Sequence, residues 1–279
     1  MDRVATLISQ GYQVLVVHGN GPQVGCIFLQ NDKAEPEIPA MPLHVCGAES
    51  QGFIGYLLQQ ELDHALAKRN LPRKVVACVT QSYVDPQDKA FESPSKPVGP
   101  FYTAEQAEVI RREKGYTVVE DAGRGYRIVV PSPMPTGFVE EEALKCLVEN
   151  GFNIISTGGG GIPVVREGEQ IKGINAVIDK DLGASVLAEV TNATEFMILT
   201  DVPEALINYR KENEAPLRDV SVAEMKQYIE EGHFAKGSML PKVQACLRFV
   251  ERTGKPAIIT SLDLALDAVQ GHRGTKIHA

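Results

Sequence analysis

The sequence has 279 residues, which is long enough to bury the core of one large domain or of two. Hydrophobic residues make up 43% of it and charged residues 23%, as in ordinary globular proteins, and the net charge of −8 argues against broad electrostatic binding to nucleic acid or to an anionic membrane. The five cysteines are scattered without a CxxC pair, no apolar stretch reaches membrane-spanning length and no apolar signal region follows Met1, which favours a reduced protein of the cytoplasm.

Helical and extended patterns alternate along the chain, which predicts a layered α/β fold with a largely parallel sheet. The first half predicts, in chain order, a helix over residues 1–10, a strand over 14–17, a helix opening at Pro22, a long amphipathic helix through 54–66 and a strand over 74–80. Between residues 82 and 135 prolines recur and the alternation weakens. We expect a small protruding subdomain there, with one helix that begins at a capping box of Thr103 and Gln106.

The α/β alternation resumes after this segment. The second half predicts a helix through 143–148, strands over 152–156 and 195–201, a helix from a capping box at Ser221 and Glu224, a helix after Pro241, a strand over 256–260 and a last helix capped by Ser261. We interpret the chain as one domain with two lobes, residues 1–150 and 151–279.

Two glycine-rich loops each follow a short apolar run. Residues 18–22 open a helix, where uncapped N–H groups and the helix dipole favour an anion, although glycine and asparagine would also suit a tight turn. Residues 158–161 are four consecutive glycines, and each forfeits about 1 kcal/mol of backbone entropy. Close approach of this backbone to a phosphate would account for the loss.

Charged residues at helix starts supply the cations that phosphate chemistry needs. Lys180 lies between Asp179 and Asp181 at an expected helix start, a pattern that also fits an N-cap aspartate beside solvated charge. Lys242 falls in the first turn of a helix, against the dipole preference, and a bound anion would explain it. The six histidines show no metal-ligand spacing, and the sequence contains neither a GxxxxGK[ST] loop nor a GxGxxG fingerprint.

Six motifs occur in the order found in carbamate kinases, and the chain resembles this family from its first residues to Thr275. The motifs are residues 18–25, 96–101, 120–127, 158–163, 177–181 and 231–242. The strings at 120–127 and 232–242 separate carbamate kinases from the wider amino-acid kinase family.

The resemblance implies a three-layer αβα sandwich with a mostly parallel open sheet. Residues 1–150 would form the carbamate-binding lobe and residues 151–279 the nucleotide-binding lobe. The implied reaction is reversible phosphoryl transfer between ATP and carbamate, giving ADP and carbamoyl phosphate, with Mg²⁺ accompanying the nucleotide. The family mostly makes ATP in the breakdown of arginine or related nitrogen compounds, and the resemblance favours a homodimer.

The family's roles carry over to individual residues where the motifs match. The catalytic residues would be Lys180, Lys242 and Lys96. The residues expected to bind the substrate are His18, Gly19, Asn20, Gly21, Gly158, Gly159, Gly160, Gly161 and Arg124. The residues expected beside the nucleotide are Asp179, Asp181, Thr200, Asp201, Tyr209 and Met239. Asp179 and Asp181 would orient the lysines or bind Mg²⁺ through the nucleotide.

Two other hypotheses stand beside a carbamate kinase. One is another acyl-phosphate-forming amino-acid kinase, acting for example on N-acetylglutamate or glutamate, and the other is a relative that binds a nucleotide or a partner without catalysis. The second arises because carbamate kinases begin with a strand that ends in a Gly-Gly-Asn-Ala loop, which does not precede the first expected helix here. We expect this to leave two neighbouring strands unpaired and to weaken folding and activity.

Overall fold

The computed structural model describes residues 1–35, 37–121, 123–235 and 237–279, so Ala122 and Lys236 of the motif strings lie outside the described residues. The helices are α1 (Asp2–Ser9), α2 (Gly21–Ala34), α3 (Leu43–Ala67), α4 (Ala104–Lys114), α5 (Glu141–Glu149), α6 (Lys180–Val190), α7 (Val222–Glu230), α8 (Met239–Thr253) and α9 (Ala265–Val269). The strands are β1 (Leu15–Val16), β2 (Val75–Ala77), β3 (Gln81–Val84), β4 (Lys96–Tyr102), β5 (Val118–Glu120), β6 (Tyr126–Val130), β7 (Pro135–Phe138), β8 (Asn153–Ile155), β9 (Ile162–Glu167), β10 (Gln170–Gly173), β11 (Phe196–Thr200), β12 (Leu206–Ile207), β13 (Ala215–Pro216), β14 (Asp219–Ser221), β15 (Ala257–Ser261) and β16 (Thr275–His278). Within the described ranges, no helix combines the length and apolarity needed to cross a bilayer.

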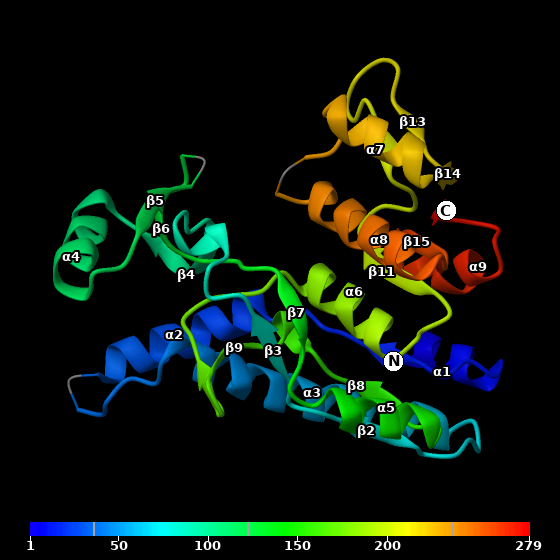
Figure 1. The fold of residues 1–279 in the computed structure, drawn as a ribbon, viewed down its shortest axis with the longest axis horizontal. Helices are drawn as coiled ribbons and strands as arrows, with labels where there is room; N and C mark the ends of the chain where they lie inside the picture. The colour runs from blue at the N-terminus through cyan, green and yellow to red at the C-terminus, as the bar shows by residue number, and fades with distance from the viewer. Residues whose placement is uncertain (36, 122, 236) are drawn as a thin grey trace.

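A parallel sheet of β1, β8 and β2 forms the centre of the first lobe, with helices on both faces (Figure 1). Successive side chains of a strand point to opposite faces, and β8 uses both. Ile154 packs with Leu144 of α5 and Val186 of α6, whereas Ile155 packs with Leu62 and its neighbours on α3. The helices over both faces give the αβα sandwich that the resemblance implies.

A second sheet, in the order β10-β9-β3-β7, continues the lobe beyond the first. The strand expected over 74–80 is shorter than predicted and ends at Ala77, and β3 follows it after a break at Thr80. Both β8 and β9 come after residue 150 but pair with β1, β2 and β3, so the sheets of the first lobe extend past that residue. The β9–β10 hairpin, which the sequence analysis did not anticipate, belongs to the same sheet.

The second lobe is built on a sheet in the order β11-β15-β16-β14, covered by α7 and α8. The capping box predicted at Ser221 and Glu224 is confirmed as the start of α7, and the helix expected after Pro241 is α8, whose Val243, Cys246 and Val250 are buried. α8 begins at Met239, two residues before Pro241. Proline is tolerated in this first turn because the N–H that it lacks would have no acceptor within the helix.

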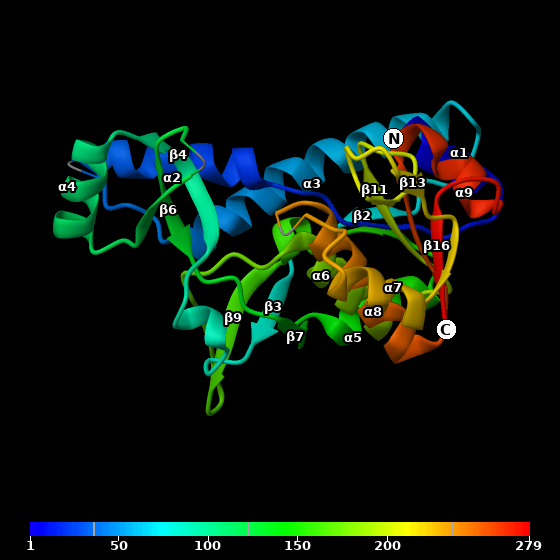
Figure 2. The same ribbon diagram turned by 90° about the horizontal axis from the view of Figure 1, so that it is seen from above.

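An antiparallel unit of β4, β6 and β5 with α4 protrudes at one end of the molecule, above α2 (Figures 1 and 2). The Thr103–Gln106 capping box starts α4 as predicted. The unit spans residues 96–130, since residues 82–84 and 135 pair in the main sheet. It is tied to α2 by ion pairs of Lys114 with Asp32 and Glu35.

The prediction of a Ser261 cap on the last helix is wrong. Ser261 ends β15 and precedes a 3-10 turn, η3 (Leu262–Leu264), without a hydrogen bond from its side chain to the turn. The helix α9 begins only at Ala265. A serine after a strand is compatible with either turn, which the sequence pattern does not distinguish.

The two lobes present facing strand edges. Within the described ranges, β1 pairs only with β8 and β11 pairs only with β15. A cavity of about 660 Å³ lies against both edges and is lined, among other side chains, by Leu15, Val17, Phe196 and Ile198. The unpaired edges of β1 and β11 in the described ranges therefore both border this cavity.

Candidate active site

The N-terminus of α6 carries the charged cluster predicted from the sequence. Asp179 is the N-cap, and its side chain accepts a hydrogen bond from the backbone N–H of Asp181 at 2.9 Å. This contact begins α6 at Lys180, so the N-cap interpretation of the aspartate is confirmed. Because Asp179 caps the helix, Lys180 and Asp181 project from the first turn toward the neighbouring elements.

Asp181 joins two lysines from different helices. Its carboxylate lies 2.5 Å from Nζ of Lys180 through Oδ1 and 2.9 Å from Nζ of Lys242 through Oδ2. The carboxylate is nearly buried, and the side chain of Lys242 is only 16% exposed. Lys242 in the first turn of α8 therefore has an acidic partner in the structure, which offsets its unfavourable interaction with the helix dipole.

Lys96 brings the protruding unit to the same helix end. Its Nζ lies 2.9 Å from Oδ2 of Asp179. Burial alone raises the pKa of the Asp179 carboxyl, but the charge of Lys96 and hydrogen bonds from Lys96 and from the N–H groups of Asp181 and Leu182 outweigh it, so this pKa lies below its usual range. Three lysines and two aspartates leave one net positive charge, which suits a cluster that receives phosphate oxygens.

The four glycines of residues 158–161 are each approached by another part of the protein. A Cβ atom on Gly158 would lie 2.2 Å from Nε2 of His18, and one on Gly159 would lie 2.3 Å from the amide of Asn20. On Gly160 it would meet Ile178, and on Gly161 it would meet the Ser82 hydroxyl. The run of glycines predicts close approach of a phosphate, whereas in the structure side chains and backbone of the protein already occupy the space.

The N–H groups of this loop are largely used inside the protein. Gly159 donates to the carbonyl of His18 at 2.8 Å, Gly160 to that of Thr157 at 2.9 Å and Gly161 to that of Gly158 at 3.2 Å. The prediction that the loop holds an anion through these three backbone donors therefore needs correction for this conformation. The first N–H groups of α2, which have no acceptor within their helix, are the better donors.

His18, Gly19 and Asn20 form a wall of the site that packs against this loop. Nδ1 of His18 lies 3.1 Å from the carbonyl of Gly19, so that nitrogen is the one that carries the hydrogen. Burial lowers the pKa of His18, against the opposing effect of this hydrogen bond, which favours the neutral ring. The amide of Asn20 donates to the Ser50 hydroxyl at 2.8 Å, and the Lys180 side chain lies across Gly19, where a Cβ atom would meet its Cδ at 3.2 Å.

Four of the residues expected beside the nucleotide lie on the second lobe, whereas Asp179 and Asp181 lie at the start of α6. Thr200 ends β11, Asp201 follows it, and Tyr209 is exposed with the guanidinium of Arg210 over its ring. Met239 begins α8, three residues before Lys242. The strand end and the helix start thus place these side chains on the lobe that carries one of the site lysines.

Arg124 does not join the lysine cluster. Its partners in the described part of the chain are Asp121, at 3.0 Å, and the ring of Phe101, at 5.0 Å. Its prediction as a substrate-binding residue remains untested. Gly21 begins α2, directly after the Asn20 N-cap.

Asp179 and Asp181 do not present free oxygens to a metal ion. Each oxygen already accepts from a lysine or a backbone N–H, and the described residues contain no group of three or more side chains that suits a metal ion. These carboxylates fit the predicted orientation of lysines better than direct metal ligation.

Several buried polar residues that hold the site were missed by the sequence analysis. Ser50 and Gln51 of α3 and Thr80, Ser82 and Thr157 are all buried. Ser50 and Gln51 follow Glu49 within α3, and no local pattern there distinguishes a buried polar side chain from an exposed one. Ser50 bonds Asn20, and Ser82 donates to the carbonyl of Gly160 at 2.8 Å.

The arrangement matches known proteins over nearly the whole chain. Residues 1–261 match the amino acid kinase family. The chain is 64% identical to the carbamate kinase of Trichomonas vaginalis, covering 99% of this chain and 89% of that protein, and 52% identical to the carbamate kinase of Pyrococcus furiosus, covering 99% and 88%. Among solved structures, carbamate kinase from Giardia lamblia bound to AMP-PNP superimposes with a TM-score of 0.93 at 50% identity, over 99% of this chain and 87% of that one. The chain therefore belongs to the carbamate kinases of the amino acid kinase family.

Proposed function

We propose that this protein is an ATP:carbamate phosphotransferase, which interconverts ATP and carbamate with ADP and carbamoyl phosphate. The observation that carries the proposal is the convergence of Lys180 and Lys242 on the buried Asp181, with Lys96 on the adjoining Asp179. Phosphoryl transfer needs alignment and compensation of charge on the equatorial oxygens, and little covalent help. A preformed group of lysines fits that requirement.

The lysines have distinct roles in this proposal. Lys180 and Lys242 come from the two sides of Asp181 and neutralise the charge that develops on the transferred phosphoryl group. Lys96 reaches the carbamate end from the protruding unit. Asp179 and Asp181 hold the three ammonium groups in place between turnovers, so that no charge has to reorganise when the substrates arrive.

The carbamate site is formed by the start of α2 and by the glycine loop. The N–H groups of Gly19, Asn20 and Gly21 and the Asn20 amide bind the small anion, and His18 closes the site as a neutral ring. Residues 158–161 support this wall from behind. Carbamate has no side chain, which suits a site bounded this closely, whereas N-acetylglutamate or glutamate would need additional space.

The nucleotide is proposed to bind the second lobe, beside Thr200, Asp201, Tyr209 and Met239. The relative from Giardia lamblia was solved with AMP-PNP, which supports an adenine nucleotide here. We propose that Mg²⁺ reaches the site with the nucleotide and is held by its phosphate oxygens, since Asp179 and Asp181 are engaged with lysines and backbone N–H groups.

Physiologically, we propose that the enzyme works in the cytoplasm and makes ATP during the breakdown of arginine or related nitrogen compounds. This direction is chemically favourable because carbamoyl phosphate is an acyl phosphate with a high phosphoryl-transfer potential. The proposal follows from the family's usual role.

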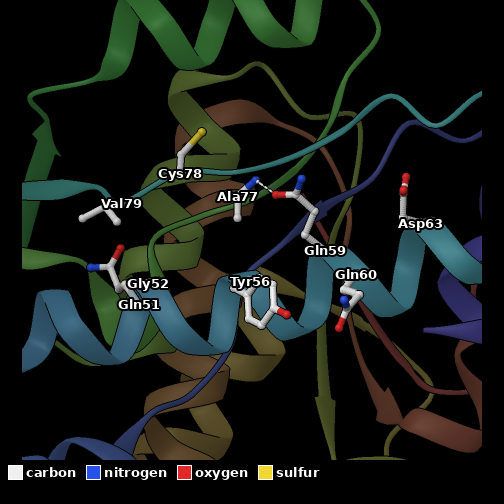
Figure 3. Close-up of a pocket in the computed structure, with 9 residues that line it drawn as sticks. All are labelled: Gln51, Gly52, Tyr56, Gln59, Gln60, Asp63, Ala77, Cys78 and Val79. Carbon is white, nitrogen blue, oxygen red and sulfur yellow. Dashed lines mark hydrogen bonds between the residues drawn. The ribbon is translucent and has the colours of Figure 1, made fainter.

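We also propose a homodimer, with the outer face of α3 at the interface. Phe53, Tyr56 and Leu57 are exposed on α3, and Tyr56 also lines a cavity of about 460 Å³ together with the exposed Val79 (Figure 3). Large apolar side chains gathered on one surface are typical of an association site. Leu57→Glu is expected to convert the dimer to a monomer in light scattering, and a monomeric parent protein would contradict the proposal.

A coupled assay of ATP formation from ADP and carbamoyl phosphate tests the proposed reaction. We expect turnover with carbamoyl phosphate and none with the acyl phosphates of N-acetylglutamate or glutamate. Turnover only with one of the latter would identify another acyl-phosphate-forming kinase. Binding of ADP without any turnover would identify a non-catalytic relative.

A further inference from the structure

Gln51 forms a buried connection between α3 and the backbone of Thr80. Its Oε1 accepts from the Thr80 N–H at 3.0 Å and from the Thr80 hydroxyl at 3.3 Å, and its Nε2 donates to the Thr80 carbonyl at 3.2 Å. Gln51 is 4% exposed and Thr80 is fully buried. The side chain thus pairs with the backbone at the break between β2 and β3.

The Thr80 hydroxyl continues the connection to the glycine loop. Its only hydrogen points to Gln51, so its oxygen is available to accept the N–H of Thr157 at 2.7 Å. Thr157 is fully buried and has a φ of 54°, a conformation that β-branched residues rarely adopt. Such a backbone persists only where its surroundings hold it.

Thr157 fixes the start of the loop. Its carbonyl accepts from Gly160, and the next residues place the Gly159 N–H on the His18 carbonyl at 2.8 Å. A rotation of Thr157 would therefore displace the wall formed by His18 and Asn20, beside Lys180. Ser82, which donates to the Gly160 carbonyl, holds the other end of the turn.

We propose that Gln51 and Thr80 are positioning residues for the phosphoryl transfer, holding Thr157 in its left-handed conformation and with it the substrate wall of the site. The expected change in rate rests on the proposed function. The expected change in the conformation of the loop rests on the hydrogen bonds alone. A displacement of about 1 Å at a site of this kind can lower a rate on the order of 100-fold.

The same helix provides a matched control. Gln59 lies two turns after Gln51, and its Oε1 accepts the backbone N–H of Ala77 at 2.7 Å, shown as a dashed line in Figure 3. This contact also joins a glutamine of α3 to a strand backbone. Ala77 lies on β2 and does not bond the loop, so loss of Gln59 should affect stability without moving Thr157.

The experiment compares Thr80→Val, Thr80→Ser, Gln51→Met and Gln59→Met. We expect Thr80→Val and Gln51→Met to lower kcat/KM for carbamoyl phosphate roughly 10–100-fold while KM for ADP stays within about twofold, since the nucleotide lies on the other lobe. Thr80→Ser keeps the hydroxyl and should restore most of the activity, and Gln59→Met should retain it. Assays well below each melting temperature separate this effect from unfolding.

Amide hydrogen exchange supplies a readout that does not depend on turnover. In Thr80→Val and Gln51→Met, the amides of residues 157–161 should exchange at least about tenfold faster than in the parent protein, and in Gln59→Met they should not. Unchanged exchange in Thr80→Val, or equal acceleration in Gln59→Met, would overturn the inference. An inactive parent protein would instead refute the proposed function and leave the exchange comparison decisive for this one.

Discussion

At the scale of single residues, Lys180 and Lys242 reach Asp181 from different helices, and we expect the loss of either lysine to have the same effect on the rate. If either Lys180 or Lys242 becomes alanine, the other still pairs with the buried carboxylate, so the fold should persist. Each variant loses one donor to the transferred phosphoryl group, and we expect kcat to fall by about 10²–10³-fold. Coupled ATP formation measures this, with thermal melting as the check on folding.

Lys172→Ala is the matched control for these variants. Lys172 is exposed and pairs with the exposed Glu167 across the β9–β10 hairpin, and this ion pair includes none of the site residues. Exposed pairs of this kind contribute about 0–1 kcal/mol, so activity and stability should both be retained. Turnover close to that of Lys172→Ala in either site variant would mean that its lysine is structural.

The burial of His18 makes the free energy of unfolding depend on pH, and the direction of this dependence follows from the pKa shift. Burial lowers its pKa in the folded state, so between that value and the ordinary 6.5 the unfolded chain binds more protons. The contribution of His18 to the free energy of unfolding is therefore complete above pH 6.5 and is lost as the pH falls through the folded-state pKa. Urea unfolding between pH 5 and 7.5 should show this loss in the parent protein and a smaller slope in His18→Gln. Identical slopes in both proteins would contradict the assignment.

The sequence predicts which residues belong to the site better than it predicts the contacts that these residues make. The motifs identified Lys96, Lys180, Lys242 and the glycines of residues 158–161 as site residues. The contact of Asp181 with Lys242, and the side chains that fill the space above Gly158, Gly159 and Gly161, join segments more than 50 residues apart. Local pattern carries no information on such contacts, because they follow from packing of the complete fold.

At the scale of elements, the glycine loop tolerates no Cβ at its centre. Gly160 has a φ of +93°, and a Cβ there would lie 2.7 Å from the carbonyl oxygen of Ile178. Gly160→Ala therefore combines backbone strain with a clash, and we expect a loss of about 3 kcal/mol or more in the free energy of unfolding. Gly168→Ala is the control, since Gly168 also has a positive φ, of +63°, but nothing lies within 4 Å. It should lose only about 1–2 kcal/mol, and equal losses would mean that the clash is absorbed.

Helices were the easiest elements to predict, and short strands the hardest. The capping boxes of α4 and α7 are local signals, and both were confirmed. The β9–β10 hairpin and β16 were missed, because their stability comes from pairing with β3 and with β15 and β14, which are distant in the sequence. A strand of four residues has too few positions for its alternation to stand out.

At the scale of the whole molecule, the site forms where three parts of the fold meet. Lys96 comes from the protruding unit, Lys180 from α6 beside the first lobe, and Lys242 from α8 of the second. The chain as a whole carries a net charge of −8, yet these side chains leave a local positive charge. The concentration of cations at one junction lets an acidic protein bind an anion, and any relative motion of the parts would open or close the site.

The last prediction concerns stability and follows from the facing edges of β1 and β11. Both strands lack a partner on the cavity side within the described ranges, and the cavity is lined by their apolar side chains. Unsatisfied buried backbone groups cost about 1–3 kcal/mol each, and several together rival a domain's total stability of about 5–15 kcal/mol. We therefore expect residues 1–279 expressed alone to aggregate readily and to turn over slowly.

A strand of alternating apolar residues joined to the chain as a test should pair with both edges and raise the melting temperature, the soluble yield and the turnover together. The same extension with proline at alternate positions is the control, because proline cannot donate to a strand ladder, and it should raise none of the three. A soluble 279-residue protein that melts cooperatively and turns over carbamoyl phosphate at the rate of its extended form would contradict the prediction. In that case the cavity between β1 and β11 would be a stable part of the fold, and the backbone groups along both edges would be satisfied by water.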